Sequence, residues 1–169
     1  MKMSDTRVIA AEPGVVWAAL LDAEVLKACV PGCQEMAGSP EDGFEATVVQ
    51  KVGPVKATFK GAVSLTDMDE PNRLTLSGEG KGGAAGFAKG SSTVDLTPEG
   101  HGTRITYEVN ASVGGKLAQL GSRIIDSFAK KMADQFFERF QAVVECTDGD
   151  AEVEVSEEKK GLLARLRGK

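Results

Sequence analysis

Apolar and polar residues alternate along much of the chain, and turn residues interrupt the alternation at short intervals. In residues 43–52, GFEATVVQKV, Phe44 and Val48 fall on one face and polar residues fall mostly on the other. The same two-residue period runs through residues 55–65 and 104–113. Such alternation is typical of strands that bury one face. Turns spaced this closely predict a series of antiparallel strands.

A helical period replaces the alternation near both ends of the chain. Residues 12–21, EPGVVWAALL, contain Pro13, which suits a first helical turn, and residues 23–29 continue as a second short helix. Between residues 116 and 145, apolar residues recur at steps of three and four with charged residues opposite, which predicts one long helix. The order of elements predicts an α+β fold, in which a curved antiparallel sheet wraps around the long C-terminal helix.

Glycines are concentrated in residues 78–90, GEGKGGAAGFAKG, inside a region that otherwise has the pattern of strands. Glycine in a strand often marks a bend, a bulge or a close approach to the backbone. We therefore expect a strongly curved sheet with a hollow beneath it, although a flexible linker is the simpler alternative. The inward positions of the predicted strands are almost wholly apolar, and Tyr107 is the only ionisable residue among them.

Length and composition favour a single soluble domain of ordinary type. The chain has 169 residues and a formal net charge of −5, which argues against general nucleic-acid binding because phosphate contacts need a basic face. No apolar run is long enough to span a bilayer, and no signal peptide is evident. Three cysteines, an odd number, do not form a disulfide framework, so a reducing cytoplasm is the expected compartment.

Two of these cysteines, Cys29 and Cys33, flank a Val-Pro-Gly turn in residues 26–36, LKACVPGCQEM. A zinc site needs about four ligands, and only His101 and Cys146 could add to the pair, so we expect no metal site. A catalytic thiol needs an adjacent base, which the neighbouring sequence lacks. We interpret both cysteines as small apolar residues that line or cap a cavity.

The segment VWAALLDAEVLKACVPGCQEM, residues 16–36, resembles a family signature: a Val-Trp pair, a short Asp-x-Glu segment and a hydrophobic-Pro-Gly-Cys turn. With the glycine-rich strands and the long last helix, residues 1–145 resemble the CoxG family, named for the G subunit of carbon monoxide dehydrogenase. This family is part of the SRPBCC or START-like helix-grip superfamily. The resemblance implies an apolar cavity between the sheet and the helix, and a protein that binds a lipophilic ligand.

The resemblance also implies partners and a location. CoxG proteins are associated with the aerobic molybdenum-containing carbon monoxide dehydrogenase, or a related molybdenum hydroxylase, at the inner face of the cytoplasmic membrane. We expect a carrier without enzymatic activity or covalent cofactor, which binds a respiratory quinone (menaquinone or ubiquinone) and links the dehydrogenase to the membrane quinone pool. Two alternatives remain: a membrane-recruitment or assembly factor with an incidental cavity, and a polyketide cyclase or aromatase-like enzyme, which would need polar groups deep in the cavity.

The expected cavity wall combines inward strand positions, one face of the last helix and the turn between the cysteines. The predicted ligand-binding residues are Trp17, Cys29, Val30, Pro31, Phe44, Val48, Phe59, Phe87, Tyr107, Leu120, Ile124 and Phe128. Phe87 belongs to this set only if a bulge reverses the alternation beside the glycines. For Trp17 and Tyr107, packing in the core is the competing interpretation.

The chain divides into a ligand-binding domain at 1–146, an acidic linker at 147–158 and a basic, apolar tail at 159–169, KKGLLARLRGK. We expect this tail to bind anionic lipid weakly and reversibly, since each basic residue contributes ~1 kcal/mol near such a surface. A disordered tail without lipid contact is the alternative. The predicted membrane-contact residues are Lys159, Lys160, Leu162, Leu163, Arg165, Leu166 and Arg167.

Overall fold

The structure of this chain, a computed structural model, describes residues 1–154, with side chains through residue 146. Its order of elements is the one that the hydrophobic pattern predicts. The elements are β1 (Lys2–Ile9), α1 (Pro13–Leu20), α2 (Ala23–Cys29), β2 (Cys33–Ser39), β3 (Gly43–Val52), β4 (Val55–Asp69), β5 (Arg73–Lys81), the 3-10 helix η1 (Gly83–Ala85), β6 (Phe87–Glu99), β7 (Gly102–Gly114), the 3-10 helix η2 (Gly115–Leu120) and α3 (Ser122–Glu154).

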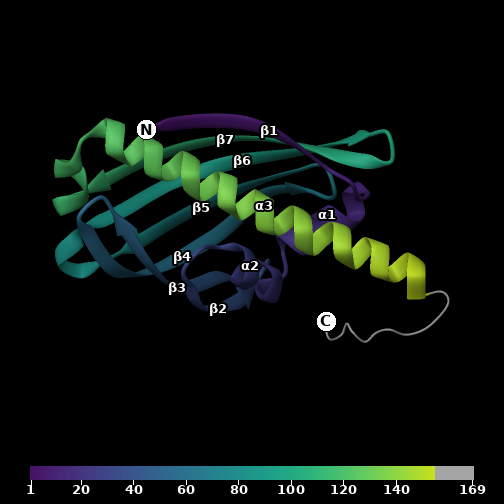
Figure 1. The fold of residues 1–169 in the computed structure, drawn as a ribbon, viewed down its shortest axis with the longest axis horizontal. Helices are drawn as coiled ribbons and strands as arrows, with labels where there is room; N and C mark the ends of the chain where they lie inside the picture. Colours follow the sequence, from purple (N-terminus) through teal and green to yellow (C-terminus); the bar gives the residue numbers. More distant parts are fainter. Residues whose placement is uncertain (155–169) are drawn as a thin grey trace.

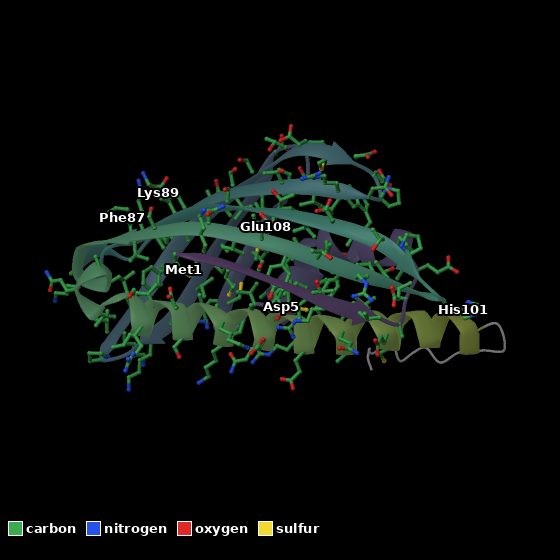
Figure 2. All side chains as sticks on the ribbon, turned by 90° about the horizontal axis from the view of Figure 1, so that it is seen from above. Met1, Asp5, Phe87, Lys89, His101 and Glu108 are labelled. Atoms are coloured by element: carbon green, nitrogen blue, oxygen red, sulfur yellow. The ribbon has the colours of Figure 1, made fainter. Side chains whose placement is uncertain are left out.

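One antiparallel sheet contains all seven of these strands, in the order β1-β7-β6-β5-β4-β3-β2. Strands β2 to β7 follow one another as hairpins, and β1 returns to pair with β7. Helix α3 runs diagonally across the sheet (Figure 1), and the sheet arches over it (Figure 2). The prediction of an α+β helix-grip fold is therefore confirmed.

The long helix begins later than the sequence pattern predicts. Residues 115–120 form the short helix η2, and Gly121 separates it from α3 with φ 91° and ψ 157°, a conformation open essentially to glycine alone. The predicted helix start at residue 116 is therefore wrong, because the periodicity does not register this break. At its other end α3 continues to Glu154, past the predicted boundary at 146. The predicted tail at 159–169 lies outside the described residues.

A solid hydrophobic core fills only one part of the space under the sheet. It gathers residues from β1, α1, α2, β5, β6, β7 and the second half of α3, and its fully buried members include Ile9, Val16, Ile105 and Phe140. Further along the sheet the burial changes. The inward residues of β4 are half-buried along the strand instead of fully buried. Part of the inner face is therefore not covered by packed side chains.

Candidate functional site

A cavity of about 880 Å³ lies between the inner face of the sheet and the first half of α3. This volume is within the range of sites that hold drug-sized ligands, roughly 300–1,000 Å³. The sheet supplies much of the wall, and Leu20, Leu26, Val30 and Pro31 close one side from the two short helices and the turn after them. The helix contributes one face, at steps of three and four residues: Ile125, Phe128, Ala129, Met132, Ala133, Phe136 and Phe137.

Small residues on the sheet and on α3 leave space for the hollow. Two glycine pairs lie directly opposite on neighbouring strands, Gly61 with Gly80 and Gly78 with Gly90. Gly78 and Gly80 continue the two-residue period of Leu74 and Leu76, which line the cavity, so they are inward positions without a side chain. On the opposite side α3 presents Ala129 and Ala133. The glycine-rich strands thus bear out the expectation of a curved sheet over a hollow.

The cavity opens where η2 meets α3. Nearly all wall residues are buried or half-buried, and the exposed ones fall between residues 112 and 126. We define the cavity mouth by these exposed residues, Ser112, Ala118, Gly121, Ser122 and Asp126. At the other end Tyr107 and Phe137 belong both to the wall and to the solid core. Their rings stack with centroids 5.0 Å apart, and they form the floor.

Seven of the twelve residues predicted to bind a ligand line this cavity. They come from the turn after α2, from β3, β4 and β7, and from α3: Val30, Pro31, Phe44, Val48, Phe59, Tyr107 and Phe128. The ring of Phe59 lies so close to Gly82 that a Cβ built there would be 2.5 Å from its Cε1 atom. Glycine at this position therefore allows Phe59 to occupy the wall.

Trp17 and Cys29 do not line the cavity, so the prediction places them wrongly. Both belong to the solid core, where Trp17 is 4% exposed and Cys29 is fully buried. Each short helix turns another residue to the cavity instead, Leu20 from α1 and Leu26 from α2. For Trp17, the competing interpretation of core packing is the one that the structure supports.

Phe87, Leu120 and Ile124 are also absent from the wall. Phe87 is 39% exposed on the side of the sheet away from α3 (Figure 2), because no bulge interrupts the pairing of β5 with β6 or of β6 with β7. Leu120 precedes the break at Gly121, so it does not share the helical face. Ile124 is 38% exposed, and its neighbour Ile125 faces the cavity instead, about 100° further around the helix.

Several wall residues that the sequence analysis missed lie on elements it had identified. Met36, Val63 and Leu65 continue the alternation of β2 and β4. Met132 and Phe136 share one face of α3 with Phe128. Ile124 and Ile125 lie four and three residues before Phe128, so the helical period alone allows either of them on this face.

Residues 6–145 match the family of the carbon monoxide dehydrogenase G subunit (CoxG). The chain belongs to the CoxG family. The resemblance that the segment at 16–36 indicated is therefore confirmed, and it extends over sheet, cavity and α3 alike.

Solved structures agree with this CoxG fold. A conserved protein from Geobacillus kaustophilus shares 28% identity, with a TM-score of 0.81 over 87% of this chain and 97% of its own. The protein TTHA0849 from Thermus thermophilus has 18% identity and a TM-score of 0.67, and it covers 87% of this chain and 99% of its own. CV1439 from Chromobacterium violaceum has 17% identity and a TM-score of 0.64 over 85% and 96% of the two chains. No curated protein matches the chain.

Polar residues in the wall of this CoxG cavity come from separate elements. Gln50 on β3 donates a hydrogen bond from its side-chain amide to the carbonyl of Pro31, which holds the turn after α2 against the sheet. Ser92 lies on β6, while Ser122 and Asp126 lie at the mouth on α3. Within residues 1–146, no three His, Cys, Asp or Glu side chains are grouped so that they could hold a metal ion.

Tyr107 is the polar residue at the cavity floor. Burial raises the pKa of its hydroxyl, and the neighbouring Arg7 guanidinium partly opposes this shift. The hydroxyl is therefore protonated at neutral pH, and it can donate a hydrogen bond to an oxygen atom of a bound molecule. Its pKa lies above the range in which a general base for neutral pH operates.

A group of charged residues joins α3 to the edge strand β1 beside the floor. Arg7 forms an ion pair with Asp134 of α3, and Lys130 forms another with the same carboxylate at 2.9 Å. The guanidinium of Arg7 also lies over the ring of Phe137, 5.3 Å from its centroid. Lys130 and Arg7 lower the pKa of Asp134. These contacts hold the helix against the open edge of the sheet.

The two cysteines that flank the Val-Pro-Gly turn are both thiols. Burial raises the pKa of Cys29 to about 11, and it also raises the pKa of Cys33. The Cys33 Sγ donates to the carbonyl of Glu35 at 3.2 Å. Since the thiolate is the reactive form, Cys29 is a poor nucleophile at neutral pH. Cys29 acts as a small apolar residue of the core, and neither cysteine lines the cavity.

No helix in the described part of the chain has an apolar stretch long enough to cross a membrane.

Proposed function

We propose that this protein is a carrier of a lipophilic molecule, a respiratory quinone, that serves a carbon monoxide dehydrogenase or a related molybdenum hydroxylase. One observation carries the proposal: a cavity of about 880 Å³, walled almost entirely by apolar side chains, in a member of a family that takes its name from that dehydrogenase. A hollow of this kind costs packing energy, so a protein that is selected only for stability would fill it.

The energy available from the wall suits reversible binding. Burial of about 300 Å² of apolar ligand surface contributes on the order of 7 kcal/mol before the costs of ordering the ligand. A quinone ring has two carbonyl oxygens, and in this proposal the protonated hydroxyl of Tyr107, a wall residue, donates a hydrogen bond to one of them. The isoprenoid tail would extend along the apolar faces of α3 and the sheet towards the cavity mouth.

The chemistry in this proposal takes place on the ligand. The quinone accepts two electrons from the dehydrogenase together with two protons and leaves as a quinol, while the protein supplies position and protection from water. The cyclase alternative needs polar groups that converge on a substrate deep in the cavity. The polar wall residues lie on separate elements: Tyr107 is at the floor, Ser92 is on β6, Ser112, Ser122 and Asp126 are at the mouth, and Gln50 is bonded to the Pro31 carbonyl. We therefore favour a carrier.

We further propose that the basic tail, residues 159–169, gives the carrier a weak hold on the membrane that contains the quinone pool. This segment lies outside the described residues, so its support is its sequence alone: basic residues interspersed with three leucines. A membrane-recruitment role for the dehydrogenase is compatible with the same segment.

Quinol formation by the purified dehydrogenase tests the carrier function. The enzyme is supplied with carbon monoxide and with quinone bound either to this protein or to detergent micelles. We expect faster quinol formation from the protein-bound quinone, since the carrier delivers it to the enzyme in a defined position. Equal rates from both sources, at equal quinone concentration, would contradict delivery by this protein.

A further inference from the structure

The end of the molecule that holds the cavity mouth also holds an unusual group of lysines. Lys51 and Lys56 lie directly opposite each other across the β3–β4 hairpin, and Lys60 lies opposite Lys81 across β4 and β5. We call these four residues the lysine patch. All four side chains are exposed, and none forms an ion pair within the described residues. Like charges directly opposite in a sheet destabilise it. Two such pairs together therefore indicate that these lysines have a function that outweighs the loss of stability.

The lysine patch and the cavity mouth are close in space. In Figure 1 the β3–β4 hairpin, the β5–β6 connection and the start of α3 share one end of the molecule. A Cβ built on Gly53, in that hairpin, would lie 3.6 Å from Cγ2 of Ile124 and 3.9 Å from Cδ1 of Leu120. The hairpin that carries Lys51 and Lys56 therefore lies against the residues that flank the mouth.

Exposed apolar side chains accompany these charges. Ile124 is 38% exposed beside the mouth, and Phe87, which pairs with Lys81 across β5 and β6, is 39% exposed.

The charges along β4 are divided between its two ends. Residues 51–60 contain three lysines and no acid, whereas residues 65–72 contain three acids and no base. The latter segment ends β4 and forms the next turn. At about 3.3 Å per residue, Lys56 near the start of β4 lies roughly 43 Å from Asp69 at its end, and Lys60 lies roughly 23 Å from Asp67.

We infer that the mouth end, rather than one face of the sheet, docks on an anionic lipid surface through the lysine patch, with Phe87 from the outer face of the sheet and Ile124 from α3 entering the interface. An acidic bilayer fits because it offers both a negative surface for the lysines and an apolar layer for the two side chains. The acidic far end would point away from the membrane, and the cavity would open towards the lipid. This inference rests on the proposed function for its ligand class, and it assigns the docking surface to the folded domain in addition to the tail.

The test measures sedimentation of the full chain with vesicles of phosphatidylcholine, with or without phosphatidylglycerol. The variant Lys56→Glu/Lys81→Glu turns both like-charge pairs into opposite-charge pairs, so it is expected to fold at least as well as the wild type. The control Lys27→Glu/Lys131→Glu makes the same change in net charge at exposed helix positions. Since each basic residue near such a surface contributes about a fivefold gain in affinity, loss of two lysines weakens binding at least about 25-fold.

We expect the wild type and the control to bind the anionic vesicles, and the patch variant to bind them at least about 25-fold more weakly. The inference is wrong if the wild type does not sediment with anionic vesicles, if both variants lose binding equally, or if the patch variant binds as the wild type does. Organic extraction of each variant measures its quinone content independently. Unchanged quinone content with unchanged vesicle binding of the patch variant would reject the docking surface and leave the carrier function standing.

Discussion

Two consecutive isoleucines at the start of α3 provide a matched test of the cavity. Ile125 lines it, whereas Ile124 is 38% exposed on the neighbouring face of the helix. Arginine in place of Ile125 brings a guanidinium into an apolar wall, while the same substitution at Ile124 brings it into solvent. The two variants have identical composition and charge, so a difference between them reports the direction of one side chain.

The expected magnitude follows from the wall around Ile125. Loss of its apolar contact removes about 1 kcal/mol or more of ligand binding, and an unpaired buried charge costs several kcal/mol. Together these amount to at least about 3 kcal/mol, or a loss of about 100-fold in affinity. In the empty protein the arginine reaches water through the cavity mouth, so Ile125→Arg keeps the fold.

The assay is the quinone content per chain after purification from the same host, with thermal unfolding as the check on folding. We expect Ile124→Arg to retain the wild-type content and Ile125→Arg to be nearly empty. Wild-type content in Ile125→Arg would show that the ligand lies elsewhere. An equal loss in both variants would show that the substitutions act on α3 as a whole, and the assignment of the cavity face would be wrong.

Three further predictions address how the cavity is built and held. Gly80 faces open space, because no atom lies within 4 Å of a Cβ built there. Gly80→Leu should therefore lower the quinone content and raise the free energy of unfolding, measured by chemical denaturation, by up to about 1 kcal/mol. A quinone content equal to that of the wild type would argue against the cavity. Gly121→Ala should lower the free energy of unfolding by about 1–3 kcal/mol because of the backbone conformation at this position. Gly14→Ala in α1, with open space around it, should stabilise the protein slightly. Equal effects of the two substitutions would contradict the break before α3. The pKa of Asp134 is lowered by Lys130 and Arg7, so its ion pairs add stability above the unfolded pKa of about 3.9 and lose it as the pH falls through the folded value. Asp134→Asn should therefore lower the melting temperature at neutral pH and converge with the wild type in acid, and a difference that persists in acid would refute this origin.

The sequence predicted the strands well because each depends on a local pattern with a period of two residues. That period holds even at Phe87, where strict alternation gives the observed outward position and the assumed bulge does not exist. The glycine-rich strands correctly predicted a hollow, since a missing side chain at an inward position leaves space regardless of its neighbours. The family signature at 16–36 was equally informative, because the family match covers it.

The remaining errors concern features that one-dimensional patterns do not encode. Trp17 and Cys29 lie on elements that border the cavity, but which part of the space is filled depends on residues far away in sequence, such as Phe140. The position of Leu120 depended on Gly121, whose role as a helix break becomes visible only from its backbone angles. The choice between Ile124 and Ile125 depends on how α3 packs against the sheet, since both fit the helical period. A glycine before a serine can start a helix or interrupt one, and the apolar period continues across it unchanged.

Native mass spectrometry of the full-length protein, isolated from a host that makes quinone, tests most directly whether the hollow beneath the sheet holds a lipophilic molecule. We predict a wild-type population heavier than the bare chain by the mass of one quinone, and a Gly80→Leu sample that shows mainly the bare chain. A wild-type protein that carries only its own mass, from cells with a full quinone pool, would contradict the account.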